Sequence, residues 1–499
     1  MQTLEKFPLP LALDYETDTD ITAAIELLLL AKPGVAAHLL DVATHTGIVE
    51  LTGFVDSLLA GQRAEEIALA VRGVRGVVNE LLIRTTDRPD AELLLDVTLA
   101  LAADPATADY NVQATVADGV ATLTGMVQSW AERELVRRVV QGVRAVRRLV
   151  DHELLIQWGE FVNSDEEITT QIRELLDWDI RVYGALVTVH TAGRVVYLAG
   201  TVGTAAEKAH LVATAYAAGA SRVDAQELAV EFWALSSVLR RDKFAPRPDA
   251  DVAQAVRDTC RLDPRVPPTP LLVQVRRGAV TLCGTVPSLR AKQAAEQDAR
   301  NVVGVGDVHN LLKVRTHHLE TAAAVRQSIL TALARNPYLV TFDFSVQVLD
   351  GKAYLYGLVN NHFEQDQAAD VAAGAHGVVA VENRVGLPHA GGLGGAPAFE
   401  RTAQALHRAA GPDPDGALAE RIRTHLFWSA SLHEQDLQVR VDHGRATLLG
   451  TVDTWLDRRQ AAFEAYEAGA RDVNNHLRVR TDAPTLATSL LPAHELASR

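Results

Sequence analysis

Short runs of alternating apolar and polar residues recur along the chain and end in similar phrases. Six five-residue phrases end in glycine, with valine two places later, at Gly53, Gly125, Gly200, Gly284, Gly357 and Gly450. A second glycine stands six residues earlier in five copies, and seven earlier in the third, where it is Gly193. Alternation around such a turn predicts a β-hairpin, and we expect the six phrase-ending glycines to be structural turn glycines. The extra residue in the third copy predicts a bulge or a longer turn.

Helical spacing follows each hairpin. In the first copy, apolar residues between Leu59 and Val71 recur on one face, and polar residues occupy the other. The N-cap positions of four such helices carry Ser57, Ser129, Ser288 and Thr454. Each helix is expected to close at a small residue, namely Gly73, Ala145, Gly219, Gly304, Gly377 or Gly469. Because Ala145 departs from glycine, we expect the helix of the second copy to end differently, nearer Gly142.

A further helix precedes each hairpin, and an apolar strand follows the second helix. Asp249 to Leu262 is one such first helix. Four final strands carry asparagine two residues after their first valine, at Asn79, Asn310, Asn383 and Asn475. The chain is therefore predicted to be α+β, with six tandem αββαβ modules, each a small mixed three-stranded sheet packed against two helices.

The repeat sets the predicted domain boundaries. The modules are expected at 19–86, 90–157, 164–232, 249–316, 318–387 and 414–481, with an N-terminal segment at 1–18 and a C-terminal tail at 482–499. The linker at 233–248 is expected to hold an interface helix ending at Pro246. The Gly/Pro-rich linker at 388–413 is expected to contain a short helix at 398–410 and to let the sixth module move.

The repeated phrases resemble the BON (bacterial OsmY and nodulation) domain. The fourth copy reads VTLCGTV and then GVGDVHNLL, and the first reads VELTGFV and then GVRGVVNELL. The second and third copies match least, since Ala145 replaces a glycine and Ala225 stands near the asparagine position. The resemblance implies the αββαβ fold, a non-enzymatic role, and links to osmotic stress, phospholipid surfaces or multi-domain assemblies.

Composition and charge narrow the possible partners. The 499 residues are 48% hydrophobic and 22% charged, which is ordinary for globular proteins. The formal charge of −15 argues against a generic binder of nucleic acid, so no nucleic-acid partner is expected. The two cysteines, Cys260 and Cys283, are expected to be buried packing residues. The start lacks an apolar signal region, which predicts a cytoplasmic protein, while the family resemblance leaves a periplasmic or extracellular location open.

Candidate chemistry is sparse. His317 and His318 are sequence neighbours, and His433 and His443 flank a strand without acidic residues in a ligand spacing. No nucleophile elbow, phosphate loop or dinucleotide loop is present in the sequence. We therefore expect no catalytic residue, no metal and no cofactor.

A basic stripe in the second copy is the best candidate site for an anionic ligand or an interface. It consists of Arg133, Arg137, Arg138, Arg144, Arg147 and Arg148. The favoured alternative is a solvated helix face that pairs with Glu132, Glu134 and a neighbouring module. Aromatic residues follow the hairpin at Trp130, Phe363 and Trp455, where packing at the helix start is favoured over contacts with partners.

These patterns favour a non-enzymatic structural or adaptor protein that mediates self-association or protein–protein assembly, in stress or envelope maintenance. The expected partners are copies of itself or other proteins. The alternative is peripheral binding of phospholipid or another small anionic ligand through basic module surfaces.

Overall fold

The computed structural model describes residues 16–157, 163–267, 271–316, 320–387 and 414–479. The linker at 388–413, with its expected helix, the histidine pair at 317–318 and the C-terminal tail lie outside the described residues. Six αββαβ modules follow one another, so the predicted α+β fold is confirmed.

The first three modules share one order of elements. Module 1 contains α1 (Asp18–Ala31), β1 (Leu40–His45), β2 (Ile48–Val55), α2 (Leu58–Leu69), β3 (Gly76–Asn79) and β4 (Leu82–Ile83). Module 2 contains α3 (Asp90–Ala103), β5 (Asn111–Ala117), β6 (Val120–Val127), α4 (Trp130–Gln141) and β7 (Arg148–Ile156). Module 3 contains α5 (Asp165–Trp178), β8 (Val187–Ala192), β9 (Val195–Val202), α6 (Ala205–Ala217), β10 (Arg222–Asp224) and β11 (Leu228–Val230).

The last three modules repeat that order. Module 4 contains α8 (Asp249–Leu262), β12 (Leu272–Arg276), β13 (Ala279–Cys283), β14 (Thr285–Val286), α9 (Leu289–Arg300), β15 (Asp307–Asn310) and β16 (Lys313–Val314). Module 5 contains α10 (Ala322–Arg335), β17 (Phe344–Leu349), β18 (Lys352–Leu358), α11 (His362–Ala373) and β19 (Ala380–Gly386). Module 6 contains α13 (Pro414–Trp428), β20 (Asp436–Asp442), β21 (Arg445–Val452), α14 (Trp455–Glu467), β22 (Asp472–Asn475) and β23 (Arg478–Val479).

Each sheet has the second hairpin strand at its centre. In module 1, β2 pairs antiparallel with β1 and parallel with β3 and β4. Alternate residues of β2, such as Val49 and Leu51, are fully buried against Ile25 of α1 and Ala64 of α2. Every module has a core of this kind, so each one buries its own two helices on one face of its sheet.

Polar side chains begin the second helices as predicted. The side-chain oxygens of Ser57, Ser129, Ser288 and Thr454 accept the backbone N–H three residues later, at 3.2, 3.1, 3.1 and 3.1 Å. Thr204 and Asn361 do the same in the other two modules. These bonds satisfy N–H groups that have no partner inside the helix.

The six phrase-ending glycines lie in or directly after the second hairpin strand, so their expected place in the turn is wrong. Gly53 pairs across the hairpin with Leu40, and Gly450 with Leu437. A Cβ atom at Gly53 would lie 2.2 Å from a backbone carbonyl oxygen, and one at Gly450 would lie 1.9 Å from another. Glycine is needed there because the two strands approach closely at a positive φ, +108° and +125°.

Each hairpin turn has two residues, the third one included. In module 3 the strands pair up to the residues that flank Gly193 and Arg194, and these two have φ of +58° and +63°. In module 2 the corresponding residues, Asp118 and Gly119, have φ of +53° and +74°. The predicted bulge or longer turn is wrong, because the glycine has moved from the second turn position to the first and no residue is inserted.

The second helix of module 2 closes like its counterparts. Ala145 has a φ of +69°, in the same left-handed region as Gly73 at +86°. Helix α4 ends at Gln141 and α2 at Leu69, at the same distance from these residues. Helix α4 does end near Gly142, its C-cap, as expected, but this ending does not differ from that of α2. The backbone conformation is kept, and the alanine adopts it at a steric cost of about 1 kcal/mol.

Aspartate ties the first helix to the hairpin turn in five modules. The carboxylate of Asp18 accepts the N–H groups of Thr46 and Gly47 at 2.7 and 2.9 Å. Asp90, Asp165, Asp249 and Asp415 bind the corresponding turns. These bonds lower the pKa of Asp18. Module 5 has alanine at this position.

The linker between modules 3 and 4 packs on module 3 as short helical turns: η3 (Phe232–Leu235), α7 (Ser237–Arg240) and η4 (Arg241–Phe244). One interface helix ending at Pro246 was expected, so that expectation is wrong. The Nζ of the buried Lys243 donates to the carbonyls of Leu176, Asp179 and Val182 at the end of α5. Burial lowers the pKa of Lys243 to about 8.

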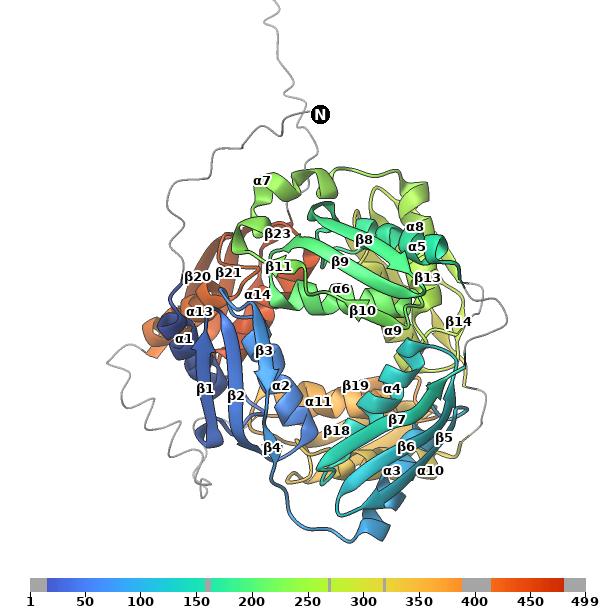
Figure 1. Cartoon of the computed structure of the whole chain (residues 1–499). Coiled ribbons are helices and arrows are strands. Elements are labelled where there is room, and N and C mark those ends of the chain that lie inside the picture. The colour runs from blue at the N-terminus through green and yellow to red at the C-terminus, as the bar shows by residue number, and fades with distance from the viewer. Residues whose placement is uncertain (1–15, 158–162, 268–270, 317–319, 388–413, 480–499) are drawn as a thin grey trace, which may run out of the picture.

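The six modules form two stacked rings of three. Figure 1 shows modules 1, 2 and 3 around a common centre, with modules 4, 5 and 6 behind them. The second helices α2, α4 and α6 lie toward that centre, where α6 contacts both α2 and α4. In the other ring α11 contacts α14 in the same way. The sequence did not predict this closed arrangement.

Candidate functional site

The first residue of each second helix contacts the next module of its ring. Leu58 packs against the core of module 2, Leu289 belongs to the core of module 5, and Ala205 to the core of module 1. These three contacts link modules 1 to 2, 4 to 5 and 3 to 1. The third link closes the first ring.

Aromatic residues occupy the same position in the other modules. Trp130 stacks on Tyr216 of module 3, with ring centroids 5.4 Å apart and planes 12° from parallel. His362 packs on Tyr466 of module 6 at 4.6 Å. Trp455 reaches Gly306 of module 4 and so closes the second ring.

Trp130 is packed at the start of its helix, as favoured, but it packs on a neighbouring module. Phe363, one residue further along its helix, contacts Tyr338 of its own module and also Arg63 of module 1, whose guanidinium lies 4.0 Å from the ring centroid. These aromatic side chains are therefore parts of module interfaces.

Backbone hydrogen bonds join the two rings at three seams. The bonds run from Arg72 N to Trp428 O and from Ala430 N to Ala70 O (2.9 and 3.0 Å), from Ile180 N to Asn301 O and from Val303 N to Trp178 O (2.9 and 2.8 Å), and from Arg144 N to Arg335 O (2.9 Å). The seams thus pair module 1 with 6, module 3 with 4, and module 2 with 5. At each seam the end of a first helix meets the end of a second helix.

A buried charge cluster strengthens the seam between the first and last modules. The Nζ of Lys32 lies 2.8 Å from Glu464 and 3.3 Å from Glu467 of α14, and Arg63 also binds Glu467. His425 lies 3.2 Å from the other carboxylate oxygen of Glu464. Burial by itself would raise the pKa of Glu464, but the hydrogen bond with His425 and the charge of Lys32 lower it to about 2.

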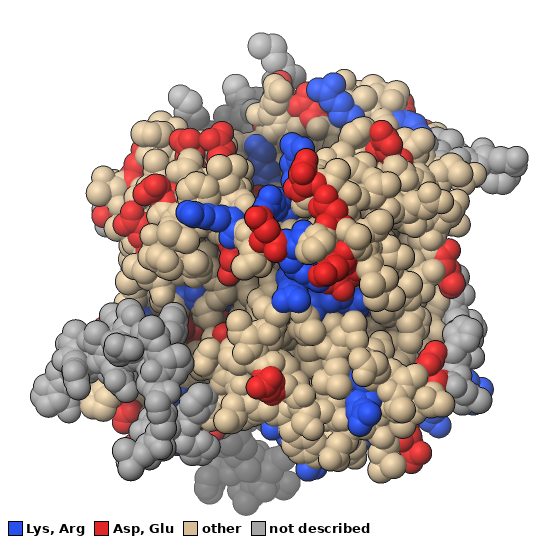
Figure 2. Space-filling model, turned by 90° about the horizontal axis from the view of Figure 1, so that it is seen from below, with Lys and Arg blue, Asp and Glu red and all other residues tan. Residues whose placement is uncertain are grey.

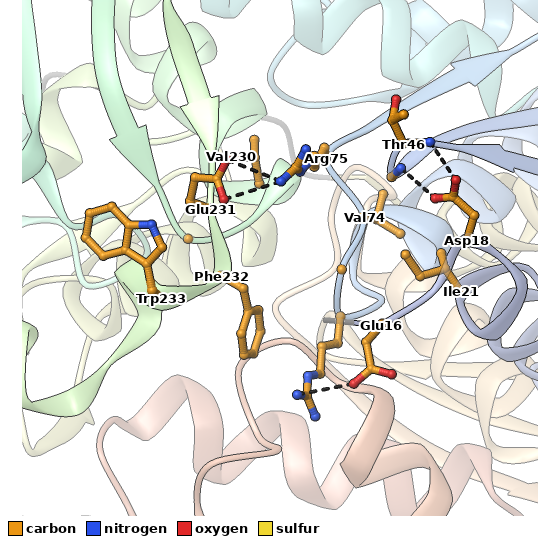
Figure 3. A pocket seen from close by; sticks show the side chains of 14 residues that line it. Glu16, Asp18, Ile21, Thr46, Val74, Arg75, Val230, Glu231, Phe232 and Trp233 are labelled. Carbon is orange, nitrogen blue, oxygen red and sulfur yellow. Dashed lines mark hydrogen bonds and ion pairs between the residues drawn. The ribbon is translucent and has the colours of Figure 1, made fainter. Parts of the chain in front are cut away.

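A cavity of about 310 Å³ lies where module 3 closes on module 1 (Figure 3). Arg75 of module 1 lies 3.2 Å from Glu231, which follows β11. Arg72 lies 3.2 Å from Glu16 and 4.9 Å from the ring centroid of Phe232. The arginines that line this cavity are thus paired with carboxylates of the same cavity, which indicates a structural role in closing the first ring.

Comparison with known families decides the nature of the modules. Six segments match the BON domain, at residues 17–85, 89–155, 164–231, 248–316, 321–387 and 414–481. Together they cover more than half of the chain. The chain belongs to the BON domain family.

Individual proteins are similar to parts of this BON array. Osmotically-inducible protein Y of Escherichia coli (strain K12) is 27% identical over 144 residues, which cover 27% of this chain and 72% of that protein. Two structures of CdsD, a structural protein of the type III secretion system of Chlamydia trachomatis, are 15% and 16% identical. They cover 47% and 46% of this chain and 100% and 92% of their own, with TM-scores of 0.12 and 0.11.

The six arginines of the predicted basic stripe do not share one environment in the second BON module. Arg133 lies 3.1 Å from Asp151, to which Arg137 is also close at 3.6 Å, and Arg147 binds Asp87. The contact of Arg133 with Asp151 takes the place of the link between asparagine and the second helix in other modules, such as Asn310 Nδ2 to Lys292 O at 2.8 Å.

The rest of the stripe is divided between an interface and the surface. Arg144 lies at the seam with module 5, and Arg138 and Arg148 form no salt bridge with another described residue. Figure 2 views the molecule from below, and basic and acidic side chains are intermixed across the middle of that face. Binding of an anionic ligand by this stripe stays a prediction.

Histidine and cysteine residues occupy unrelated places. Within the described ranges, no group of three or more His, Cys, Asp or Glu side chains is arranged to hold a metal ion. His433 packs on Phe232 at 4.5 Å, and burial lowers its pKa to about 4. His443 is exposed in a hairpin turn. Cys260 is buried as expected, and Cys283 is half-buried.

Several structural residues were missed at the sequence level. The turn-binding aspartates had a detectable signal, since each stands 29 residues before the second turn position. The interface position at the start of the second helix had none, because its side chains differ in type between modules. Among the described helices, none is long and apolar enough to cross a membrane.

Proposed function

We propose that this BON array is a non-catalytic scaffold that takes part in the osmotic-stress response of a bacterium and binds proteins through its outward sheet faces. Its partners are other proteins or further copies of the chain. The link to osmotic stress rests on the similarity to osmotically-inducible protein Y.

Exposed apolar pairs on the sheets carry the proposal. Phe54 and Leu82 are neighbours in the register of module 1 and are 39% and 61% exposed. Met126 and Leu155 are the corresponding neighbours in module 2, at 47% and 58%. Because the other faces of these sheets are buried against the helices, the apolar pairs lie on the outward faces, where contiguous apolar surface marks a contact site.

Light scattering on the purified chain tests the proposal. We expect concentration-dependent association, and we expect the double variant Phe54→Ser with Leu82→Ser to weaken it. Leu30→Ser is the matched control, because Leu30 is 70% exposed on α1, away from the sheet faces. Wild-type protein that stays monomeric and captures no partner in cross-linking, or a control that weakens association equally, would refute the proposal.

Peripheral phospholipid binding through module 2 remains the alternative. Arg138 and Arg148, which have no salt bridge among the described residues, are better test positions than the paired Arg133. Flotation with anionic vesicles that is lost in Arg138→Glu with Arg148→Glu would favour it over the scaffold. The compartment stays a prediction, and cell fractionation measures it directly.

A further inference from the structure

A second cavity, of about 240 Å³, lies where module 6 closes on module 4. Helix α9 and the residue that caps it contribute Gln297, Arg300 and Asn301, and α14 contributes Trp455, Leu456, Arg458, Arg459 and Ala462. Asn475 and Ile180 complete the lining. Like the first cavity, it lies at the interface that closes its ring, but the helices α9 and α14 form most of its lining, whereas a hairpin turn and the residues that follow α2 and β11 form most of the lining of the first.

The second cavity gathers three guanidinium groups. Arg300 is paired with Glu296 at 2.7 Å. Arg458 donates to the carbonyl of Asn475 at 3.2 Å and lies 4.7 Å from the ring centroid of Trp455. Arg459 donates to the neutral side chain of Gln297.

Two of the three charges are therefore uncompensated. Within the described part of the chain, neither Arg458 nor Arg459 forms a salt bridge, and the buried Nε of Arg458 has no hydrogen-bond partner. Desolvation, followed by repulsion from Arg300, lowers the pKa of Arg459. Arg459 itself is exposed, so water solvates its charge in part, but like charges held close together still favour an anion between them.

The interface of modules 3 and 1, which closes the first ring, does not have unpaired arginines in its cavity. Its arginines, Arg72 and Arg75, are each paired with a carboxylate. At the interface of modules 2 and 3, the residue that corresponds to Arg300 is Tyr216, and it stacks on Trp130. Structural closure is thus achieved elsewhere by ion pairs or by aromatic stacking, and the unpaired arginines call for another explanation.

We propose that this cavity binds a small organic phosphate monoester. Two unpaired guanidinium groups match a dianion, and arginine donates in a fork that fits phosphate oxygens. Trp455, Leu456 and Ala462 provide an apolar wall for the organic part. The volume is just below the range of roughly 300–1,000 Å³ that is typical of drug-sized ligands, so a smaller molecule fits.

Calorimetric titration of the full chain with phenyl phosphate tests this site, and the site does not depend on the scaffold role. We expect one binding event per chain, with inorganic phosphate and benzoate weaker, because the first lacks the ring and the second carries one charge. Arg459→Gln is expected to weaken binding about tenfold, as the loss of one charge-assisted contact does. Arg276→Gln in β12 is the matched control, since Arg276 is exposed and lines neither cavity.

The outcomes are decisive in both directions. Weaker binding by Arg459→Gln with unchanged binding by Arg276→Gln supports the site. No binding of phenyl phosphate up to about 10 mM at low salt, where even weak sites are measurable, overturns the proposal. Equal affinity of wild type and Arg459→Gln, equal loss in the control, or tighter binding of benzoate than of phenyl phosphate also overturns it.

Discussion

Removing the charge of Lys32 is expected to loosen the seam between modules 1 and 6. In Lys32→Met the buried Glu464 and Glu467 lose a cation at 2.8 and 3.3 Å. Breaking a buried ion pair on one side costs roughly 3–5 kcal/mol. Glu464 keeps the bond from Gln460, and Glu467 keeps Arg63, so we expect a loss at the lower end, about 3 kcal/mol.

Hydrogen exchange at the seam amides measures this loss where it occurs. The amides of Arg72 and Ala430 are expected to exchange about 150-fold faster in Lys32→Met, which is 3 kcal/mol expressed as a ratio. The amides of Ile180 and Val303, at the seam of modules 3 and 4, are the internal control and keep their rates. Adding Glu464→Gln removes the unpaired charge and is expected to recover part of the protection. A change below about fivefold at the first seam, or equal acceleration at both, would refute the reasoning.

Three further predictions concern a close backbone approach, a buried acid and a stacked pair of rings. Gly200→Ala places a Cβ 2.1 Å from a carbonyl oxygen and is expected to lower the free energy of unfolding by more than about 3 kcal/mol, measured with denaturant. Gly193 is also at positive φ but has open space around it, so Gly193→Ala is expected to cost about 1 kcal/mol, and equal losses would contradict this. Burial raises the pKa of Asp457 to about 6, so the folded state prefers the protonated acid. The free energy of unfolding therefore falls as pH rises from about 4 through about 6. Asp457→Asn should have a free energy of unfolding about 3 kcal/mol above that of wild type near pH 7.5, and an equal one below pH 4. A double-mutant cycle of Trp130→Ala and Tyr216→Ala should give a coupling of about 1 kcal/mol, and a value near zero would show that the stacking is incidental.

The module fold was predictable because local signals agree with one another. Ser57 begins a helix, glycine closes it, and alternating apolar residues form each hairpin, so each segment specifies its own element. The errors arose where backbone conformation is independent of residue type. Ala145 adopts a conformation that glycine usually takes, and Arg194 does the same in a hairpin turn.

The ring assembly could not be predicted from these signals. The residue at each ring interface is Leu58, Trp130, Ala205, Leu289, His362 or Trp455, and no shared chemistry marks this position. The hydrogen bonds that recur at all three seams join backbone groups, which do not depend on the type of side chain. The cavity arginines lie in two modules 159 residues apart, from Arg300 to Arg459, so only the folded chain brings them together.

The pairing of module 1 with 6, 2 with 5 and 3 with 4 is nested, and this has a consequence for how the chain folds. Modules 3 and 4 are consecutive, so their seam closes the shortest loop, and each outer pair closes a longer one at a greater entropic cost. During synthesis, module 1 emerges first, but its seam with module 6 cannot form until module 6 has been made. A chain cut short before residue 414 therefore lacks the groups that Lys32 and Arg72 contact at this seam. In such a fragment, the chaperones and proteases of the cell would meet module 1 without the module that covers its seam.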